Sequence, residues 1–406
     1  MTYELASTSW GQEELDAIAR VVGTGQFTMG DEVRRFEQAF AARFGVDHAV
    51  MMNSGSSANL VGVASLFHVH DRPLQRGDEV IVPAISWATT FHPLQQYGLK
   101  LRFVDVELDT LNLDVSKLEQ ALTPRTRMVM AVSILGNPAA LDVMRRFCDQ
   151  HRLFFFEDNC ESMGASLGGR LCGTFGDIGT FSTFYSHHIS TMEGGLLVTN
   201  RAEIANLARA IRNHGWARDC APAKPASGER DDFFEAYRFI LPGYNVRPLE
   251  MCGAIGLEQL KKLDGMLETR RANAAVFNQL FGGDDRFILQ REHGRSSWFS
   301  FTIILNPARR IDRARVMSAM RAGGIGFRMI TGGSFLRHEA ATFFDYDVVG
   351  DLANADTAHD HGFFVGNHPR DLTAELRHLH AVLDEAAQPA GPPAAAERRT
   401  PNAERP

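Results

Sequence analysis

The feature of this chain that most constrains its fold is a series of short, continuously apolar runs separated by stretches with helical periodicity. Seven such runs lie at residues 49–52, 80–82, 101–106, 128–132, 153–156, 179–181 and 196–199. Apolar runs without polar alternation are typical of strands buried on both faces, and intervening helices favour parallel pairing. The pattern therefore predicts an α/β fold with a mainly parallel sheet that is covered by helices on both sides.

Beyond this region the pattern changes to one long helical segment, followed by a mixture of strand and helix. Residues 249–277 predict the long helix, 298–305 a strand, and 313–322 and 373–386 two further helices. We therefore expect a large domain over residues 1–260, N-terminal helices included, and a smaller α+β domain over 261–388. Residues 389–406 are rich in Ala, Pro, Glu and Arg and predict a disordered tail.

Composition argues against several function classes. The net charge of −7 and the lack of a basic cluster predict no nucleic-acid partner. No stretch has the length and apolarity of a signal peptide or a membrane span, so we expect a cytoplasmic protein without a membrane partner. The five cysteines include no C-x-C or C-x-x-C pair. We therefore expect no disulfide framework, no iron–sulfur cluster and no bound metal.

Candidate site residues stand where the predicted strands end, because ligands of open α/β sheets bind outside the carboxyl ends of the strands. Ser56 and Ser57 follow the first run and open a helix, where backbone N–H groups suit a phosphate, although an ordinary N-cap is the alternative. Trp87 follows the second run and is either a stacking face for a ring or a core aromatic. Asp158 follows the fifth run and can pair with a protonated heterocyclic nitrogen, cap a helix or bind a metal.

The most unusual stretch, residues 182–195, follows the sixth run. It contains the adjacent histidines His187 and His188 and ends in Glu193-Gly194-Gly195. Ser182 can add a phosphate contact, and either histidine can act as a base. A phosphate cradle, a stacking aromatic and an aspartate at the depth of the sheet together describe a site for pyridoxal 5′-phosphate.

These motifs resemble those of the sugar aminotransferase family of fold-type-I pyridoxal phosphate enzymes, which act on nucleotide-linked keto sugars, over residues 7–370. The resemblance is carried by the loop 55–58, Trp87, the run 158–161 and the element 243–247, Gly-Tyr-Asn-Val-Arg. It implies a large parallel-sheet domain with a smaller C-terminal domain. It also implies a homodimer with shared active sites, in which Asn245 reaches the cofactor of the neighbouring subunit. The other implied cofactor contacts are Ser56, Ser57, Trp87, Asp158 at the pyridine nitrogen, Glu161 and Ser182.

One position departs from the aminotransferases of this family. They carry a lysine, which bonds to the cofactor, where the register of Glu193-Gly194-Gly195 places His187. An imidazole cannot form that bond, and none of the five lysines stands near a strand end in this region. The stretch resembles instead the 3-dehydratase branch, which uses the pyridoxamine form of the cofactor. Residues 213–219 and 245–260 resemble the same branch, and most of all its members that act on GDP-linked 4-keto-6-deoxymannose.

This branch implies removal of the C3 hydroxyl from a nucleotide-linked 4-keto-6-deoxy sugar to give the 4-keto-3,6-dideoxy sugar, with His187 as base. L-glutamate regenerates pyridoxamine 5′-phosphate, and no iron–sulfur reductase is required. Substrate contacts are expected from His188, which is the alternative base, and from His214, Arg247 and Arg328. An aminotransferase-like enzyme acting on another keto substrate and a non-catalytic family member remain alternatives, and GDP, TDP and CDP all stay open as the nucleotide.

Overall fold

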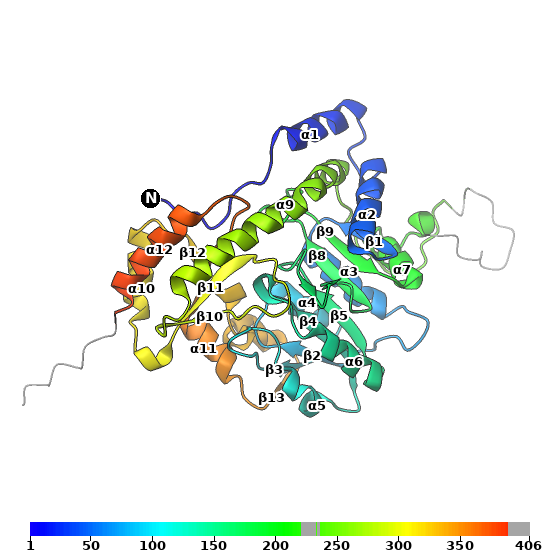
Figure 1. Ribbon diagram of the computed structural model, residues 1–406. Helices are drawn as coiled ribbons and strands as arrows, with labels where there is room; N and C mark the ends of the chain where they lie inside the picture. The colour runs from blue at the N-terminus through cyan, green and yellow to red at the C-terminus, as the bar shows by residue number, and fades with distance from the viewer. Residues whose placement is uncertain (221–232, 234–235, 389–406) are drawn as a thin grey trace, which may run out of the picture.

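The computed structural model describes residues 1–220, 233 and 236–388 and has an α/β architecture (Figure 1). Each of the seven apolar runs forms a strand of one large sheet, which confirms the prediction. The predicted tail at 389–406 lies outside the described residues. The strands of the large sheet are β1 (His48–Met52), β2 (Glu79–Pro83), β3 (Lys100–Val104), β4 (Thr126–Val132), β5 (Phe154–Asp158), β8 (Ile178–Ser182), β9 (Gly195–Thr199) and β13 (Tyr346–Val349).

Within the described part of the chain, the large sheet has the strand order β1-β9-β8-β5-β4-β2-β3-β13. Neighbours from β8 to β13 pair in parallel, whereas β9 is antiparallel to both β1 and β8. Strands β1, β2, β4, β5 and β8 therefore run in the same direction and end at one edge of the sheet. The residues that follow them meet at that edge.

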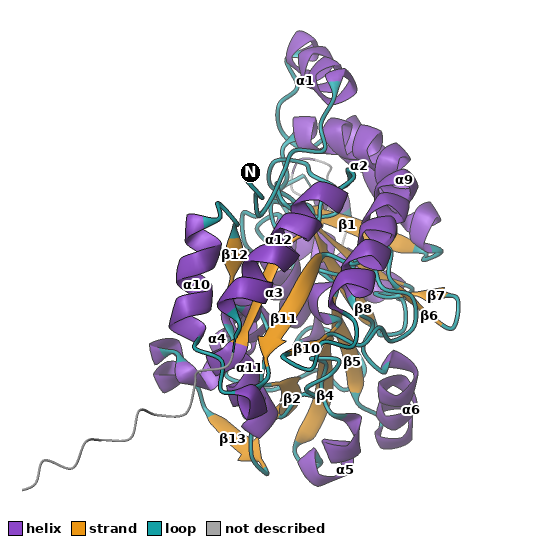
Figure 2. Ribbon diagram, turned by 60° about the vertical axis from the view of Figure 1, so that its left-hand side comes forward, coloured by secondary structure: helices purple, strands orange, loops and turns teal. Residues whose placement is uncertain are grey.

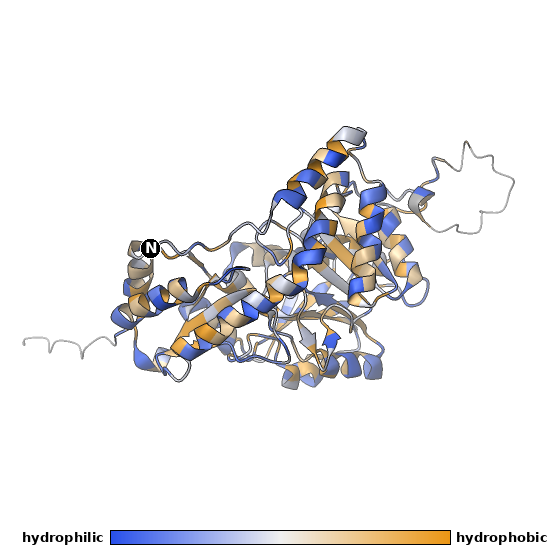
Figure 3. Ribbon diagram, turned by 45° about the horizontal axis from the view of Figure 1, so that its top comes forward, coloured by the Kyte–Doolittle hydropathy of each residue, from blue (hydrophilic) through white to orange (hydrophobic). Residues whose placement is uncertain are grey.

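Both faces of the sheet are covered, as the continuous apolar runs require (Figure 2). Along β4, Met128 and Met130 pack into the core of one face, whereas Val129 and Ala131 pack into the core of the other. Apolar residues concentrate in the strands and on the inward sides of the helices (Figure 3). The covering helices are α3 (Gly55–Leu66), α4 (Ala88–Gln96) and α7 (Ala202–Arg212) on the first face, and α5 (Leu118–Ala121) and α6 (Leu141–His151) on the second.

A single long helix, α9 (Glu250–Phe281), extends from the N-terminal helices to the C-terminal region (Figure 1). Helices α1 (Gln12–Thr24) and α2 (Asp31–Phe44) pack against its first half. The carboxylate of Glu250 accepts hydrogen bonds from the backbone N–H groups of Gly30 and Glu32, both at 2.6 Å, so α9 also caps α2.

The C-terminal region forms a second, antiparallel sheet in the order β10-β11-β14-β12. Its strands are β10 (Phe287–Leu289), β11 (Ser300–Leu305), β12 (Phe327–Arg328) and β14 (Gly362–Gly366). The predicted strand at 298–305 begins two residues late, because Trp298 has a φ of 47° that no strand accommodates. Helices α10 (Arg313–Ala322) and α12 (Thr373–Ala386) confirm the two predicted helices, and α11 (Ala353–His361) adds a third.

The two parts of the chain share secondary structure. Residue 260 lies inside α9, and β13, from the C-terminal region, pairs with β3 of the large sheet. At the other end of the chain, Tyr3 forms an isolated parallel bridge with Ile325, two residues before β12. The division into domains 1–260 and 261–388 stays a prediction. None of the described helices has the length and apolarity needed to cross a membrane.

Candidate active site

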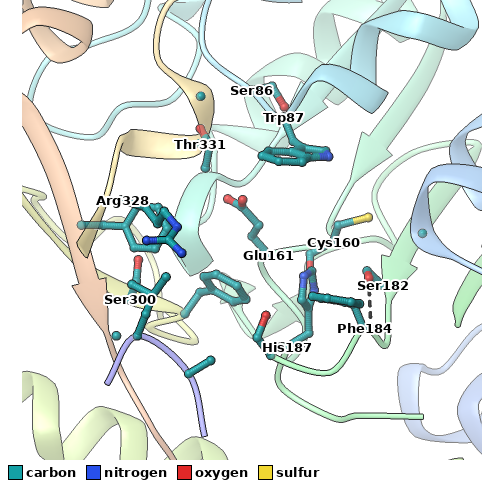
Figure 4. Close-up of a pocket in the computed structure, with 18 of the residues that line it drawn as sticks. Ser86, Trp87, Cys160, Glu161, Ser182, Phe184, His187, Ser300, Arg328 and Thr331 are labelled. Carbon is teal, nitrogen blue, oxygen red and sulfur yellow. Dashed lines mark hydrogen bonds between the residues drawn. The ribbon is translucent and has the colours of Figure 1, made fainter. Parts of the chain in front are cut away.

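A cavity of about 640 Å³ lies at the edge where the parallel strands end, with the C-terminal region forming its opposite wall (Figure 4). The wall from the large sheet includes six residues that the sequence predicted for the site: Ser56, Trp87, Asp158, Glu161, Ser182 and His187. The C-terminal wall includes Arg270, Ser300, Arg328, Thr331, Asn367 and His368. Arg328 of this second set was predicted as a substrate contact, and residues 5–7 complete the rim.

Asp158 is fixed by three hydrogen-bond donors where β5 ends. Its Oδ2 accepts from Asn59 Nδ2 at 2.8 Å and from Thr90 Oγ1 at 2.7 Å, and its Oδ1 accepts from the Cys160 N–H at 3.1 Å. Thr180 Oγ1 in turn donates to Asn59 Oδ1 at 2.6 Å and orients that amide. Because none of the described ion pairs involves Asp158, a cationic ligand group can complete its surroundings.

The N-terminus of α3 borders the cavity beside Ser182. A Cβ added to Gly55 would lie 2.7 Å from Ser182 Cβ, so only glycine permits this approach. Ser56 lines the cavity and donates from Oγ to Thr89 Oγ1 at 2.9 Å. The N–H groups of a first helical turn have no intrahelical acceptor, and together with the helix dipole they suit a phosphate.

Ser57 has a different position from Ser56. Its N–H donates to Ser54 Oγ at 3.1 Å and its hydroxyl donates to Asn53 Oδ1 at 2.7 Å. Ser54 is therefore the N-cap of α3, and Ser57 does not line the cavity. Its predicted contact with the cofactor stays a prediction.

Trp87 immediately precedes α4, and its ring lies at the cavity rather than in the core (Figure 4). Although it is a large aromatic residue, 61% of its surface is exposed. Such exposure leaves a ring face available for stacking with a planar ligand. Of the two alternatives that the sequence left open, the core aromatic is excluded by this exposure.

His187 points into the cavity with one defined tautomer. Its Nδ1 lies 2.7 Å from the carbonyl oxygen of Cys160. Because a carbonyl can only accept, Nδ1 carries the proton and Nε2 keeps a lone pair. Burial lowers the pKa of His187 to about 4. The backbone of Cys160 thus joins the two groups, since its N–H donates to Asp158 and its carbonyl oxygen accepts from His187.

His188 lies behind this wall and does not line the cavity. It is buried, its Nε2 is 3.3 Å from the Ser297 carbonyl oxygen, and its Nδ1 has no hydrogen-bond partner among the described residues. Burial lowers the pKa of His188 well below its usual value. The ring of Phe299 contacts both imidazoles, with centroid distances of 5.1 Å to His187 and 5.6 Å to His188.

Glu161 extends into the cavity below Trp87 (Figure 4). Its Oε2 accepts from the Leu135 N–H at 2.9 Å. Burial, reinforced by the nearby charge of Asp158, raises the pKa of Glu161 to about 8. At neutral pH this side chain is therefore a neutral carboxylic acid that can donate a hydrogen bond.

Three predicted site residues lie outside the cavity, on one stretch of surface. Asn245 and His214 are exposed, and Arg247 Nε donates to Asn245 Oδ1 at 3.0 Å. The backbone brings them together, because the His214 N–H donates to the carbonyl oxygen of Tyr244 at 2.7 Å. Exposed aromatic side chains, including Phe239, occur on the same segment. The described chain by itself does not bring these residues to the cavity.

Arg270 is the most prominent cavity residue that the sequence reasoning missed. It is buried on α9, and its Nη1 donates to the carbonyl oxygens of Phe299, at 3.2 Å, and Asn367. Burial lowers the pKa of Arg270 to about 10. A signal for it existed in the sequence, because Arg270 is three residues after Leu267 and four before Ala274, both of them buried positions on the helix.

Comparison with known proteins identifies the family. A model of the DegT/DnrJ/EryC1/StrS aminotransferase family matches residues 8–383. The chain belongs to this family. GDP-4-keto-6-deoxy-D-mannose 3-dehydratase of Yersinia pseudotuberculosis is 46% identical over 386 residues, which are 94% of this chain and 98% of that protein. The protein of the same name from Escherichia coli O55:H7 is 44% identical, over 94% of this chain and 100% of its own length.

A solved structure of this family has the same fold. The crystal structure of GDP-4-keto-6-deoxymannose 3-dehydratase with a trapped PLP–glutamate geminal diamine superimposes with a TM-score of 0.91 at 44% identity, covering 94% of this chain and 100% of that one. This confirms the fold and the family predicted from the motifs. The site fits pyridoxal phosphate, because Trp87 offers a free face, Asp158 lacks a cationic partner and α3 directs its N-terminus at the cavity. Among the described residues that line this cavity there is no lysine.

Metal chemistry has no evident centre in the described part of the chain. No group of three or more His, Cys, Asp and Glu side chains there is placed to hold a metal ion. Cys148, Cys160, Cys172 and Cys252 are free thiols.

Proposed function

We propose that this protein is a pyridoxal/pyridoxamine phosphate-dependent lyase that removes the C3 hydroxyl from a nucleotide-linked 4-keto-6-deoxy sugar. The observation that carries the proposal is His187, an imidazole with a free Nε2 at the position where aminotransferases of the family have their lysine. The two relatives at 46% and 44% identity, both GDP-4-keto-6-deoxy-D-mannose 3-dehydratases, support the same activity and favour GDP as the nucleotide.

The cofactor residues have separate tasks in this proposal. Pyridoxamine phosphate supplies the amine that joins the C4 carbonyl and a ring that accepts electron density. Asp158 would keep the ring nitrogen protonated, and the three donors around its carboxylate hold that carboxylate in place. Trp87 would stack on the ring, while Ser56, Ser182 and the N-terminus of α3 would hold the phosphate.

His187 moves the proton. Its low pKa keeps the imidazole neutral at physiological pH, so Nε2 could take a proton from the cofactor-bound substrate and return it to the C3 oxygen, which would leave as water. The Cys160 carbonyl fixes the ring orientation through Nδ1. Because an imidazole cannot take the place of the lysine, the amine is not delivered to C4 as a stable product, and loss of the hydroxyl is the favoured outcome.

The amino donor and the quaternary structure belong to the same proposal. L-glutamate regenerates the amine form, as the glutamate adduct in the solved relative suggests. We propose a homodimer in which the exposed Asn245 reaches the cofactor phosphate of the neighbouring subunit, with Arg247 and His214 close to it. The free thiols favour a reducing compartment, and we propose the cytoplasm.

The test uses the purified full chain, loaded with pyridoxamine phosphate and given GDP-4-keto-6-deoxymannose. We expect a product that lacks the oxygen at C3, measured by mass spectrometry and NMR, together with released ammonia. A product that keeps its C3 hydroxyl and gains an amine at C4 identifies an aminotransferase. No conversion across GDP-, TDP- and CDP-linked keto sugars indicates a non-catalytic family member.

A further inference from the structure

Asn59 is a buried polar residue of α3 whose amide is fully engaged. Its Nδ2 donates to Asp158 Oδ2 at 2.8 Å and to the carbonyl oxygen of Thr89 at 3.3 Å. Its Oδ1 accepts from Thr180 Oγ1 at 2.6 Å. A carboxylate and a carbonyl can only accept, so the amide nitrogen must face them and the amide oxygen must face Thr180. The orientation of the Asn59 amide is therefore determined by its neighbours.

Thr90, in the first turn of α4, is a second donor to the same carboxylate oxygen. Its hydroxyl donates to Asp158 Oδ2 at 2.7 Å and lies 2.7 Å from Ser86 Oγ. Because Thr90 has a single hydroxyl proton, which goes to the carboxylate, Ser86 donates to Thr90. Two short hydrogen bonds to one oxygen, from α3 and from α4, fix the rotation of the carboxylate.

Asn59 and Thr180 also fix how α3 lies on β8. Another close contact between the two elements is at Gly55, where an added Cβ would lie 2.7 Å from Ser182 Cβ. The bond between Asn59 and Thr180 is four residues further along the helix and two residues back along the strand. These steps are about 6 Å in a helix and about 6.6 Å in a strand, so the two contacts match in spacing. The bond is therefore a second register contact between α3 and β8.

This register matters because the same two elements carry both ends of the proposed cofactor site. Ser56 of α3 and Ser182 of β8 line the cavity where the phosphate is proposed to bind. Asn59, three residues after Ser56, reaches Asp158, the proposed partner of the ring nitrogen. Thr180 and Ser182 lie on the same face of the sheet, because side chains alternate along a strand. The packing of α3 on β8 thus sets the separation between the phosphate end and the nitrogen end of the site.

We propose that Asn59 and Thr180 are positioning residues, which hold the Asp158 carboxylate in register with the N-terminus of α3 and thereby keep the proton on the ring nitrogen of the cofactor. This inference rests on the proposed function, because it takes the pairing of Asp158 with that nitrogen from there. Hydrogen bonds donated to a carboxylate favour its charged form, so the shared proton stays on the ring. Neither Asn59 nor Thr180 lines the cavity, so both act through Asp158.

The competing explanation is that this hydrogen bond serves the stability of the fold alone. Asn59 is buried, and a buried amide that loses a partner destabilises a protein wherever it lies. Two measurements separate the roles, namely the protonation of the ring nitrogen and the melting temperature of the enzyme without cofactor. A purely structural role changes the melting temperature, whereas a positioning role also changes the state of the nitrogen.

The experiment loads the full chain with pyridoxamine phosphate that carries ¹⁵N in its ring, and records the ¹⁵N NMR signal of the bound cofactor. For the wild type we expect the signal of a protonated pyridine. Thr180→Val removes the hydroxyl and keeps the shape, so the signal should move toward that of a neutral pyridine. The Kd of the cofactor, measured by equilibrium dialysis, should rise by about 10- to 100-fold. Thr180→Ser keeps the hydroxyl and should retain the wild-type signal and Kd.

Thr302→Val is the matched control. It removes a buried threonine hydroxyl of β11 that does not line the cavity and has no hydrogen-bond partner among the described residues. The nitrogen signal and the Kd should both stay unchanged. Thr90→Val removes the other side-chain donor to Asp158 Oδ2, and the same movement of the signal is expected. This variant gives the test if Thr180→Val does not fold.

An unchanged nitrogen signal in folded Thr180→Val, or in Thr90→Val where the first variant does not fold, overturns the inference. A lower melting temperature without a change in the signal or the Kd does the same, because it shows a purely structural role. A neutral ring nitrogen in the wild type overturns the inference together with the role proposed for Asp158. A wild-type enzyme that gives the expected signals but dehydrates no sugar contradicts the proposed function alone.

Discussion

The two adjacent histidines offer the sharpest test of the proposed chemistry, because only one of them faces the cavity. We predict that His187→Gln lowers the rate of C3 dehydration by about 10²- to 10⁴-fold, the usual contribution of a general base, which corresponds to ~3–5 kcal/mol in the barrier. The fold should be little affected, because the glutamine amide can donate to the Cys160 carbonyl oxygen in place of Nδ1, which lies 2.7 Å from that oxygen in the wild type.

His188→Gln is the matched control. The residue is buried, and its Nε2 is 3.3 Å from the Ser297 carbonyl oxygen. A glutamine there leaves polar atoms poorly paired, which costs about 1–3 kcal/mol in the free energy of unfolding. The rate constant of the folded enzyme should stay within a few-fold of the wild type. Unfolding in urea and single-turnover dehydration, measured on the same preparations, separate the two effects.

The base is assigned to the wrong residue if folded His188→Gln loses a hundredfold in dehydration rate while His187→Gln keeps more than a tenth of the wild-type rate. The pH profile gives an independent check. Because the pKa of His187 is about 4, its imidazole stays neutral as pH falls to 5. The acid limb of kcat/KM that belongs to this group should therefore lie near pH 4 and not near 6.5.

Three more predictions concern the cofactor and its surroundings. His187→Lys should allow borohydride to trap a covalent bond to the cofactor and should abolish dehydration, and failure to trap it contradicts the proposed register. Burial raises the pKa of Glu161 to about 8, so stability from this group is present below pH 4 and is lost as pH rises to 8. In Glu161→Gln, the melting temperature should depend less on pH between pH 5 and 8. An unchanged pH dependence would show that it arises from other groups. Mixed subunits of Asp158→Asn and Asn245→Asp should recover about a quarter of wild-type activity if two subunits share each site, whereas no recovery refutes the shared site.

The large sheet could be predicted because its strands are buried on both faces, which makes each of them continuously apolar. Strand β13 was missed, because Tyr346 and Val348 are exposed at the edge of the sheet and Asp347 interrupts the apolar pattern. Its pairing with β3 joins residues more than 240 positions apart, and no local signal encodes such a contact.

The site likewise combines residues that a local sequence pattern predicts with residues that it does not. Ser56, Trp87, Asp158 and Ser182 follow strands that end at one edge, so strand direction alone brings them together. Residues of the opposite wall, such as Ser300 and Thr331, reach the cavity through the packing of the C-terminal region, for which the sequence carries no local signal.

The continuity of α9 has a consequence for how ligands enter. With 32 residues, the helix is a rod of about 48 Å that joins the layer around α1 and α2 to the wall holding Arg270. Strand β13 ties the C-terminal region back to the large sheet by a second, independent connection. Two rigid links resist a hinge motion between the walls, so the cavity has nearly its working shape before a ligand arrives. The entropic cost of ordering the site is thus met during folding, so the sugar and the amino donor lose less binding free energy to ordering it.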